Sequence, residues 1–298
     1  MNARRPPLDL LVWTALCCGL IAWAPSPPGP PPPTEEEVAA MQRAADIAAD
    51  GAKEWQAERG DLTLPWNEAS GRMAIVIDDV GRELHIFEQL LSLRFRLTFS
   101  VLPGAVYAAG SQLRAGGDRR RYREIMLHLP MEPVAPTNME EGAEAEEIFL
   151  LQTDDEATLR RKIDAALVRV PEAVAVNNHM GSRLTADRSA MDTVMDVLAE
   201  RGLAFVDSRT TAETVAEKAA AAAGIVHGAR RTSFLDHDPR PEAIEAALLE
   251  AAERSREQPV IAIAHPSLEV VEVLRTHLPR LHAQGVAVYP VSRILAGR

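Results

Sequence analysis

From Met73 onward, short apolar runs alternate with amphipathic stretches of helical composition. Runs such as Met73–Ile77 and Val260–Ala264 are almost continuously apolar, which indicates strands that are buried on both faces. The pattern predicts strands over Met73–Ile77, Leu97–Leu102, Glu124–Leu127, Ala173–Val176, Leu203–Val206, Ser233–Leu235, Val260–Ala264 and Val286–Val291. Between them it predicts helices over Glu83–Leu93, Asp154–Val170, Asp187–Arg201, Ala212–Ala223, Pro241–Glu257 and Ser267–Gln284.

This βα alternation over residues 73–298 predicts an α/β domain with a parallel sheet and helices outside it. The expected architecture is a (β/α) barrel of seven or eight strands, closed or nearly closed. An open doubly wound sheet is the alternative. The chain of 298 residues is long enough to bury a sizeable core.

The N-terminal residues 1–24 have the pattern of an export signal. Arg4 and Arg5 precede an uncharged apolar run, Leu10–Ala24. Pro25 follows the small-x-small sequence Ala22–Ala24 directly and should hinder cleavage, so an uncleaved anchor in the inner membrane is expected, with a cleaved signal peptide as the alternative. The rest of the chain would then be periplasmic.

Two segments lie between the predicted anchor and the domain. Residues 25–33 are rich in proline and predict a semi-rigid spacer. Residues 34–60 are rich in alanine and glutamate and predict a helical stalk.

Cys17 and Cys18 are the only cysteines, so the domain has no disulfide. The net charge of −11 argues against nucleic acid as a partner, and basic clusters such as Arg230-Arg231 are interpreted as solvated surface.

Acidic, amide and histidine residues follow most of the predicted strands. In parallel β/α architectures the carboxyl ends of the strands share one face, and that face carries the active site. Carboxylates and imidazoles that converge from separate strands favour a divalent metal ion, with zinc as the leading candidate. The residues concerned are Asp78, Asp79, His128, Asn177, Asn178, His179, Asp207, Arg209, Asp236 and His265.

An ordered set of motifs between Met73 and Ile294 resembles the divergent polysaccharide deacetylase family, a branch of the carbohydrate esterase superfamily. The matching motifs are Asp78-Asp79, "TFSVLPG" (Thr98–Gly104), "MLHLPMEP" (Met126–Pro133), "NNHMGSRLTAD" (Asn177–Asp187), "FVDSRTT" (Phe205–Thr211), "FLD" (Phe234–Asp236) and "IAIAHP" (Ile261–Pro266). The resemblance implies a (β/α) barrel and a carbohydrate polymer or oligosaccharide as the substrate.

The resemblance also implies roles for individual residues. Asp78 corresponds to the general base, Asp79 to a metal ligand and His265 to the catalytic acid. His128 matches the first of two metal-binding histidines that the superfamily spaces four residues apart. Glu132 stands where the second is usual, and it is assigned here as a ligand together with His179 from the next strand.

These assignments predict a hydrolase of C–N bonds other than peptide bonds, which removes acetyl groups from an envelope glycan. Residues expected to contact the substrate, or in two cases to hold the oxyanion, are Asn177, Asn178, Arg183, Asp207, Arg209 and Asp236. Two alternatives stay open: a non-catalytic envelope factor that binds glycan or a protein partner, and a metal hydrolase with another substrate. The change at Glu132 favours the first of these.

Overall fold

The computed structural model describes residues 60–117, 121–135 and 148–297. The predicted anchor (1–24) and spacer (25–33), and all but the last residue of the predicted stalk (34–60), lie outside the described residues. None of the helices described is long and apolar enough to cross a membrane.

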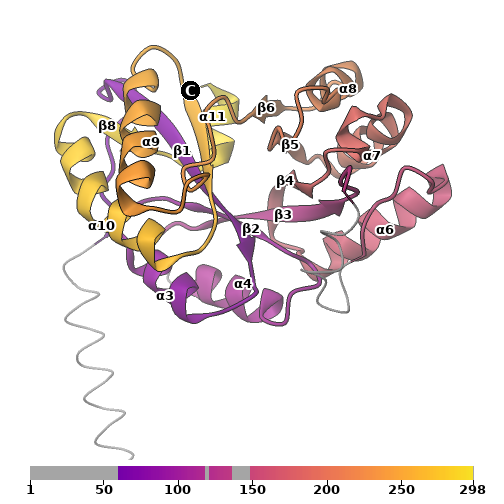
Figure 1. The fold of residues 1–298 in the computed structure, drawn as a ribbon, viewed down its shortest axis with the longest axis horizontal. Coiled ribbons are helices and arrows are strands. Elements are labelled where there is room, and N and C mark those ends of the chain that lie inside the picture. The colour runs from indigo at the N-terminus through magenta and orange to yellow at the C-terminus, as the bar shows by residue number, and fades with distance from the viewer. Residues whose placement is uncertain (1–59, 118–120, 136–147, 298) are drawn as a thin grey trace, which may run out of the picture. The chain divides into compact units, whose positions relative to one another are not determined.

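The strands form one parallel sheet that winds into a nearly closed barrel, as predicted (Figure 1). The strand order is β6-β5-β4-β3-β2-β1-β7, and β8 pairs with the beginning of β1. The barrel has a seam between β6 and β7, where Leu235 of the β6–α9 loop donates its N–H to the carbonyl of Ile263 at 2.9 Å. The strands are β1 (Gly71–Val80), β2 (Thr98–Val101), β3 (Glu124–Met131), β4 (Ala173–Met180), β5 (Ala204–Asp207), β6 (His227–Ala229), β7 (Val260–Ala264) and β8 (Val286–Val288).

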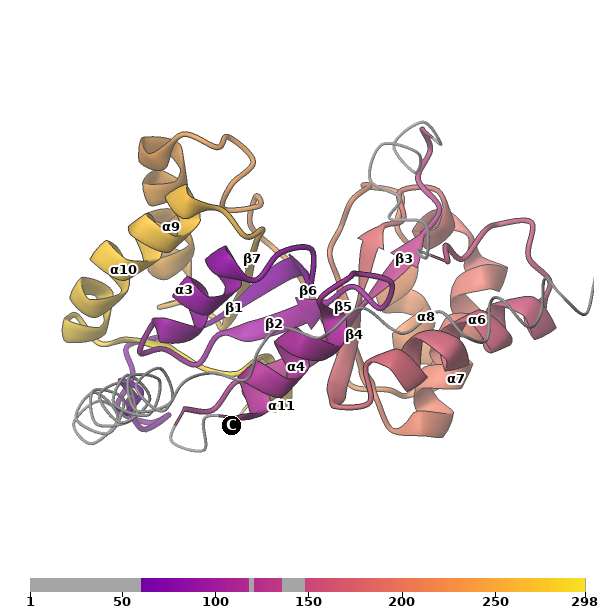
Figure 2. The same ribbon diagram turned by 90° about the horizontal axis from the view of Figure 1, so that it is seen from below.

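Helices cover the outside of the barrel, with α9 and α10 on one side and α6, α7 and α8 on the other (Figure 2). Several begin at side-chain caps: Asp155, Asp187 and Ser267 each accept a hydrogen bond from the backbone N–H three residues on. The helices are α3 (His85–Ser92), α4 (Ala108–Gly117), α6 (Glu156–Arg169), the 3₁₀ helix η1 (Leu184–Ala186), α7 (Arg188–Arg201), α8 (Ala216–Ala223), α9 (Pro241–Arg254), α10 (Leu268–Ala283) and α11 (Val291–Ala296).

Alternate residues along each strand belong to two separate cores. One set, which includes Ile75, Ile77 and Leu127, packs with the surrounding helices. The other set, which includes Val76, Met126 and Ile263, packs with residues of α11 and fills the barrel interior. The strands are therefore apolar on both faces, which explains the continuous apolar runs in the sequence.

Two predicted strands are wrong in part. Ser233–Leu235 is a loop, and β6 lies earlier, at His227–Ala229. A Cβ at position 228 would collide with Leu295 of α11, so the middle of β6 is a glycine and the apolar pattern of a strand is missing there. Val286–Val291 ends as a strand at Val288, and after Pro290 the chain turns into α11. The sequence pattern does not predict helix α4, because its three glycines hide the helical periodicity.

Helix α11 is held at the amino-terminal end of the barrel by a buried carboxylate. Glu124 of β3 accepts hydrogen bonds from the backbone N–H and the hydroxyl of Ser292, at 2.9 and 2.5 Å. Thr98 accepts one from the N–H of Val291 at 3.0 Å. The first turn of a helix leaves its N–H groups without partners, and these two side chains supply them.

Replacing Glu124 with alanine is therefore expected to lower the free energy of unfolding by about 1.5–3 kcal/mol, because the first turn of α11 loses two part-buried hydrogen bonds to a carboxylate. Urea denaturation followed by circular dichroism measures the change. Glu253→Ala removes a carboxylate whose side chain is 81% exposed and should change stability by less than about 0.5 kcal/mol. Equal effects of the two substitutions would contradict the capping role.

Candidate metal and catalytic site

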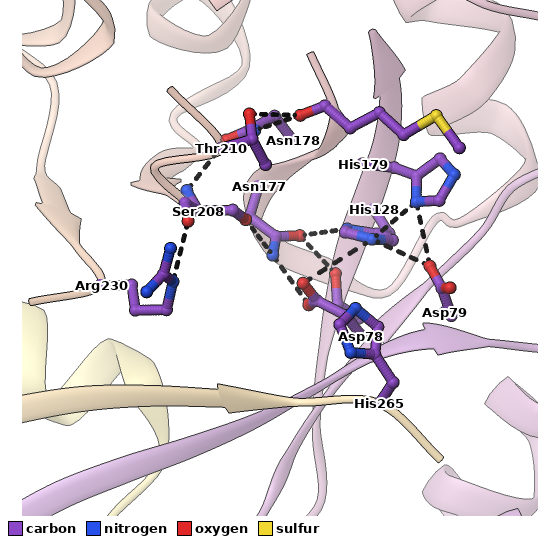
Figure 3. Close-up of polar contacts among 12 residues, drawn as sticks. Asp78, Asp79, His128, Asn177, Asn178, His179, Ser208, Thr210, Arg230 and His265 are labelled. Atoms are coloured by element: carbon purple, nitrogen blue, oxygen red, sulfur yellow. Dashed lines mark hydrogen bonds and ion pairs between the residues drawn. The ribbon is translucent and has the colours of Figure 1, made fainter. Parts of the chain in front are cut away.

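The inward positions change from apolar to polar at the carboxyl ends of the strands. Asp78 stands two residues after Val76, His128 two after Met126 and His265 two after Ile263, so all three continue the inward set. The register pairs His128 with Asn177 and Ile77 with Ala264, which places Asp78 and His265 on neighbouring strands. The polar groups at these strand ends therefore meet at one mouth of the barrel (Figure 3).

Asp79, His128 and His179 bring three metal-ligand atoms together. Asp79 Oδ1 lies 3.0 Å from His179 Nδ1 and 3.2 Å from His128 Nε2, and the two ring nitrogens are 3.2 Å apart. Donor atoms of a tetrahedral zinc site with bonds of about 2.0–2.1 Å lie about 3.3 Å apart. The triangle of one carboxylate oxygen and two imidazole nitrogens therefore fits a zinc-like ion, and these residues could hold one.

Charge and hydrogen bonding in this group favour an ionised carboxylate. Burial alone would raise the pKa of Asp79, but hydrogen bonds from His128 and His179 hold that pKa well below its ordinary value. Burial opposes the protonated form of His128, yet the charge of Asp78 and the hydrogen bond to Asp79 raise its pKa. An incoming cation would meet a carboxylate that is already charged, and it would displace a proton from His128.

The backbone at three strand ends is held in the left-handed region, which is uncommon for residues other than glycine. Asp79 has φ 53°, Met180 has φ 52° and Arg209 has φ 51°, and no other non-glycine residue in the described part of the chain has a positive φ. All three lie at the site, at the ends of β1, β4 and β5. Such conformations cost energy and concentrate where a side chain must be aimed.

Asn177 is the hydrogen-bonding centre of the site. Its Oδ1 accepts from Ser100 Oγ at 2.5 Å and from His128 Nδ1 at 2.8 Å, and its Nδ2 donates to Asp78 Oδ1 at 2.8 Å and Ser208 Oγ at 3.1 Å. Because an amide oxygen only accepts, His128 Nδ1 carries a proton, and the proton that a metal would displace is the one on Nε2, which faces Asp79. Asn177 orients both the candidate ligand and the candidate base.

Asp78 and His265 have the properties of a base and an acid. Asp78 is 1% exposed, and burial raises its pKa, although the neighbouring charges of His128 and His265 oppose the rise. Asp236 accepts hydrogen bonds from the N–H and the Nδ1 of His265, at 2.9 and 3.0 Å. Burial works against the charged ring, but the hydrogen bond to Asp236 and the charge of Asp78 raise the pKa of His265 to about 9.

Glu132, predicted as a metal ligand, lies outside the Asp79–His128–His179 group. Its carboxylate accepts the N–H of Gln152 at 2.6 Å and faces Arg183 Nε at 3.2 Å. These bonds tie the end of β3 to the segments that follow β4 and precede α6. Arg183, predicted to contact substrate, is therefore engaged in this ion pair at the rim.

The other residues predicted to bind substrate differ in how far their side chains are exposed. Asn177, Asn178 and Asp207 are fully buried and hydrogen-bonded within the protein, and their contact with a substrate or an oxyanion stays a prediction. Asp236 is bonded to His265 instead. Of the predicted set, Arg209 keeps a partly exposed guanidinium group that faces a cavity.

The sequence reasoning misses three residues of the network. Ser100 stands at an inward position in the middle of the segment "TFSVL", between the apolar Phe99 and Val101, and this polar residue is the available signal. Ser208 follows Asp207 directly. The interpretation of Arg230 as solvated surface is wrong, since this residue is half-buried and donates to the carbonyls of Ser208 and Arg209 at 2.9 and 3.0 Å.

Comparison with known proteins shows which family this chain is related to. Residues 75–295 match the family described as divergent polysaccharide deacetylase. An uncharacterised protein of Haemophilus influenzae is 32% identical over 74% of this chain and 75% of its own length. The uncharacterised protein YibQ of Escherichia coli is 34% identical over 72% of this chain and 64% of its own length.

The fold has a counterpart among solved structures. An uncharacterised protein from Agrobacterium tumefaciens superposes with a TM-score of 0.69 at 22% identity, over 78% of this chain and 93% of that one. The family match covers most of the barrel, and its range includes Asp78, Asp79, His128, His179 and His265. The chain belongs to the divergent polysaccharide deacetylase family.

Proposed function

We propose that this protein is a metal-dependent hydrolase that removes acetyl groups from N-acetylated sugars of an envelope glycan, in the periplasm and anchored to the inner membrane. The observation that carries the activity is the convergence of Asp79, His128 and His179 on one point beside Asp78 and His265. Membership of a deacetylase family supports the substrate class. The apolar run of residues 10–24 supports the location.

The residues divide the reaction into two proton transfers. A divalent ion held by Asp79, His128 and His179 would act as a Lewis acid toward the acetamide carbonyl and an attacking water. Asp78 accepts a proton from that water as its oxygen adds to the carbonyl carbon. The protonated ring of His265 then donates to the sugar nitrogen as the C–N bond breaks, so acetate and a free amine are formed.

Acetate release from N-acetylglucosamine oligomers, measured with a coupled assay on the zinc-loaded full chain, tests the proposal. We expect release from wild type and its loss after treatment with a chelator. The alternative is a non-catalytic protein that binds glycan on the same scaffold. A zinc-loaded wild type that binds the oligomers without releasing acetate would overturn the proposal in favour of that alternative.

The rate is expected to have a bell-shaped pH dependence. Asp78 works only when ionised, so the acid limb should lie above the ordinary pKa of a carboxyl group. His265 works only when protonated, so kcat/KM should fall above pH about 9. Asp236→Asn removes the negative charge beside His265 and leaves a weaker, neutral hydrogen-bond acceptor, so it should lower the pKa of His265 and move the alkaline limb to lower pH. Asp238→Asn, on the same loop, should leave that limb in place.

A further inference from the structure

A cavity of about 480 Å³ opens at the carboxyl ends of β5 and β6, on the face that carries the site. The side chains that give it its chemistry are Arg209, Thr210, Thr211, Arg230, Arg231 and Thr232. Three guanidinium groups line this cavity in a chain whose net charge is −11. The cavity, here named the arginine pocket, has no part in the proton transfers described above.

The positive charge in the arginine pocket is only partly compensated. Glu217 is the one carboxylate paired with these arginines in the described residues; it lies 2.6 Å from Arg231 and 3.6 Å from Arg209. Arg230 donates to three backbone carbonyls, those of Ser208, Arg209 and Thr232, and it has no carboxylate partner within the described part of the chain. One ion-paired carboxylate therefore stands against three guanidinium charges, while the buried carboxylates of Asp207 and Asp78 act on Arg230 at longer range, and Asp207 also acts on Arg209.

The side chain of Arg209 lines the pocket, and its guanidinium group has hydrogen-bond donors available for a ligand. Its backbone N–H donates to Asp207 at 2.8 Å and its carbonyl accepts from Arg230, which hold the residue in its left-handed conformation. Its side chain is 33% exposed, and among the described residues its guanidinium makes no hydrogen bond. The hydroxyl of Thr232, also at the pocket, is buried without a hydrogen-bond partner in the same part of the chain.

The arginine pocket is joined to the catalytic histidine by stacked groups. The Arg230 guanidinium lies 3.9 Å from the ring centre of Phe234, and that ring lies 5.3 Å from the ring of His265. Figure 3 shows Arg230 on the Ser208 side of Asn177, away from Asp79 and His179. A sugar chain whose acetamide reaches Asp78 and His265 would thus present a neighbouring substituent to the pocket.

From these contacts we infer that the arginine pocket binds an anionic substituent, a carboxylate or phosphate, on the glycan that is deacetylated. The inference rests on the proposed function and narrows its substrate class to acidic N-acetylated glycans. The planar fork of Arg209 presents donors that match the oxygens of either group. A single substituent is favoured over a polyanion, because a long run of charges would be repelled by a chain of net negative charge.

Equilibrium binding to the zinc-loaded full chain carrying Asp78→Asn tests the inference and is measured by calorimetry; without the base, turnover of the probes is expected to be about 10³-fold slower. The probes are the tetramer of N-acetylglucosamine, the same tetramer with one C6 oxidised to a carboxylate, and the tetramer with one C6 phosphorylated. We expect at least one acidic probe to bind about tenfold or more tightly than the neutral one, with a preference that weakens as salt is added. Arg209→Gln should reduce the acidic-to-neutral affinity ratio about tenfold, whereas Arg188→Gln, an exposed arginine on α7, should preserve it.

The outcomes separate this inference from the proposed activity, because binding is measured without turnover. An acidic preference that Arg209→Gln removes supports the pocket even when no acetate is released. Equal affinities for all three probes, or no binding of any of them, overturn it even when acetate is released. Which acidic probe binds more tightly decides between a carboxylate and a phosphate.

Discussion

Alanine at Asp79 is expected to abolish stoichiometric zinc binding, with a loss of affinity of at least about 100-fold. Asp79 Oδ1 touches both ring nitrogens of the group, so its removal takes away the charged donor of the three and leaves two imidazoles. His179→Ala should have a similar effect. Bound metal is measured by mass spectrometry after purification of wild type and variants without chelator.

Glu132→Ala is the matched control for this experiment. Its carboxylate is bound to Arg183 and the N–H of Gln152, so its loss should leave the zinc content near that of wild type. Zinc affinity should also fall as the pH is lowered, because the raised pKa of His128 makes its proton harder to displace. Loss of zinc in Glu132→Ala, with zinc retained in Asp79→Ala, would place the metal elsewhere.

Asparagine in place of Asp78 is expected to lower kcat about 10³-fold while zinc content stays unchanged. The amide side chain has a similar shape and its oxygen could still accept the hydrogen bond from Asn177 Nδ2, so the network should persist. It could not take a proton from water. Acetate release and zinc content, measured on the same preparation, separate loss of the base from loss of the metal.

The same substitution at Asp61 provides the structural comparison. Asp61 is a buried aspartate that pairs with Arg123 at 3.0 Å, far from the proton-transfer network in sequence and contacts. Asp61→Asn should lower stability without a comparable loss of kcat in the folded fraction. A rate for Asp78→Asn close to that of wild type would show that another group takes the proton.

The parts of the fold that can be predicted are those with strong local patterns. The run "VIAIA" forms β7 with the predicted bounds, because five consecutive apolar residues between Pro259 and His265 fit a buried strand. Strand β6 escapes prediction because its sequence, His-Gly-Ala, is selected by contact with α11, which lies far along the chain. The position of β6 is determined by tertiary packing, so no local sequence pattern predicts it.

The sequence predicts where in the barrel the site lies, but it does not predict which side chains bond to one another there. That Asp78, His128, His179 and His265 share one mouth follows from parallel strands alone. The position of the Glu132 carboxylate outside the Asp79–His128–His179 group depends on Arg183 and Gln152, which approach it from later loops. The burial of Asn177 depends on serines from two other strand ends, and such convergence is invisible in any single segment.

The seam between β6 and β7 has a consequence for the motions of the barrel. Strand β6 is three residues long and, in the described part of the chain, pairs on one side only, so residues 227–236 are expected to exchange their amide hydrogens faster than β1 and β3, which are paired on both sides. The arginine pocket lies on one side of this seam and His265 on the other. A glycan that occupied both would join the two sides, and ligand binding would be seen as slower exchange along the seam.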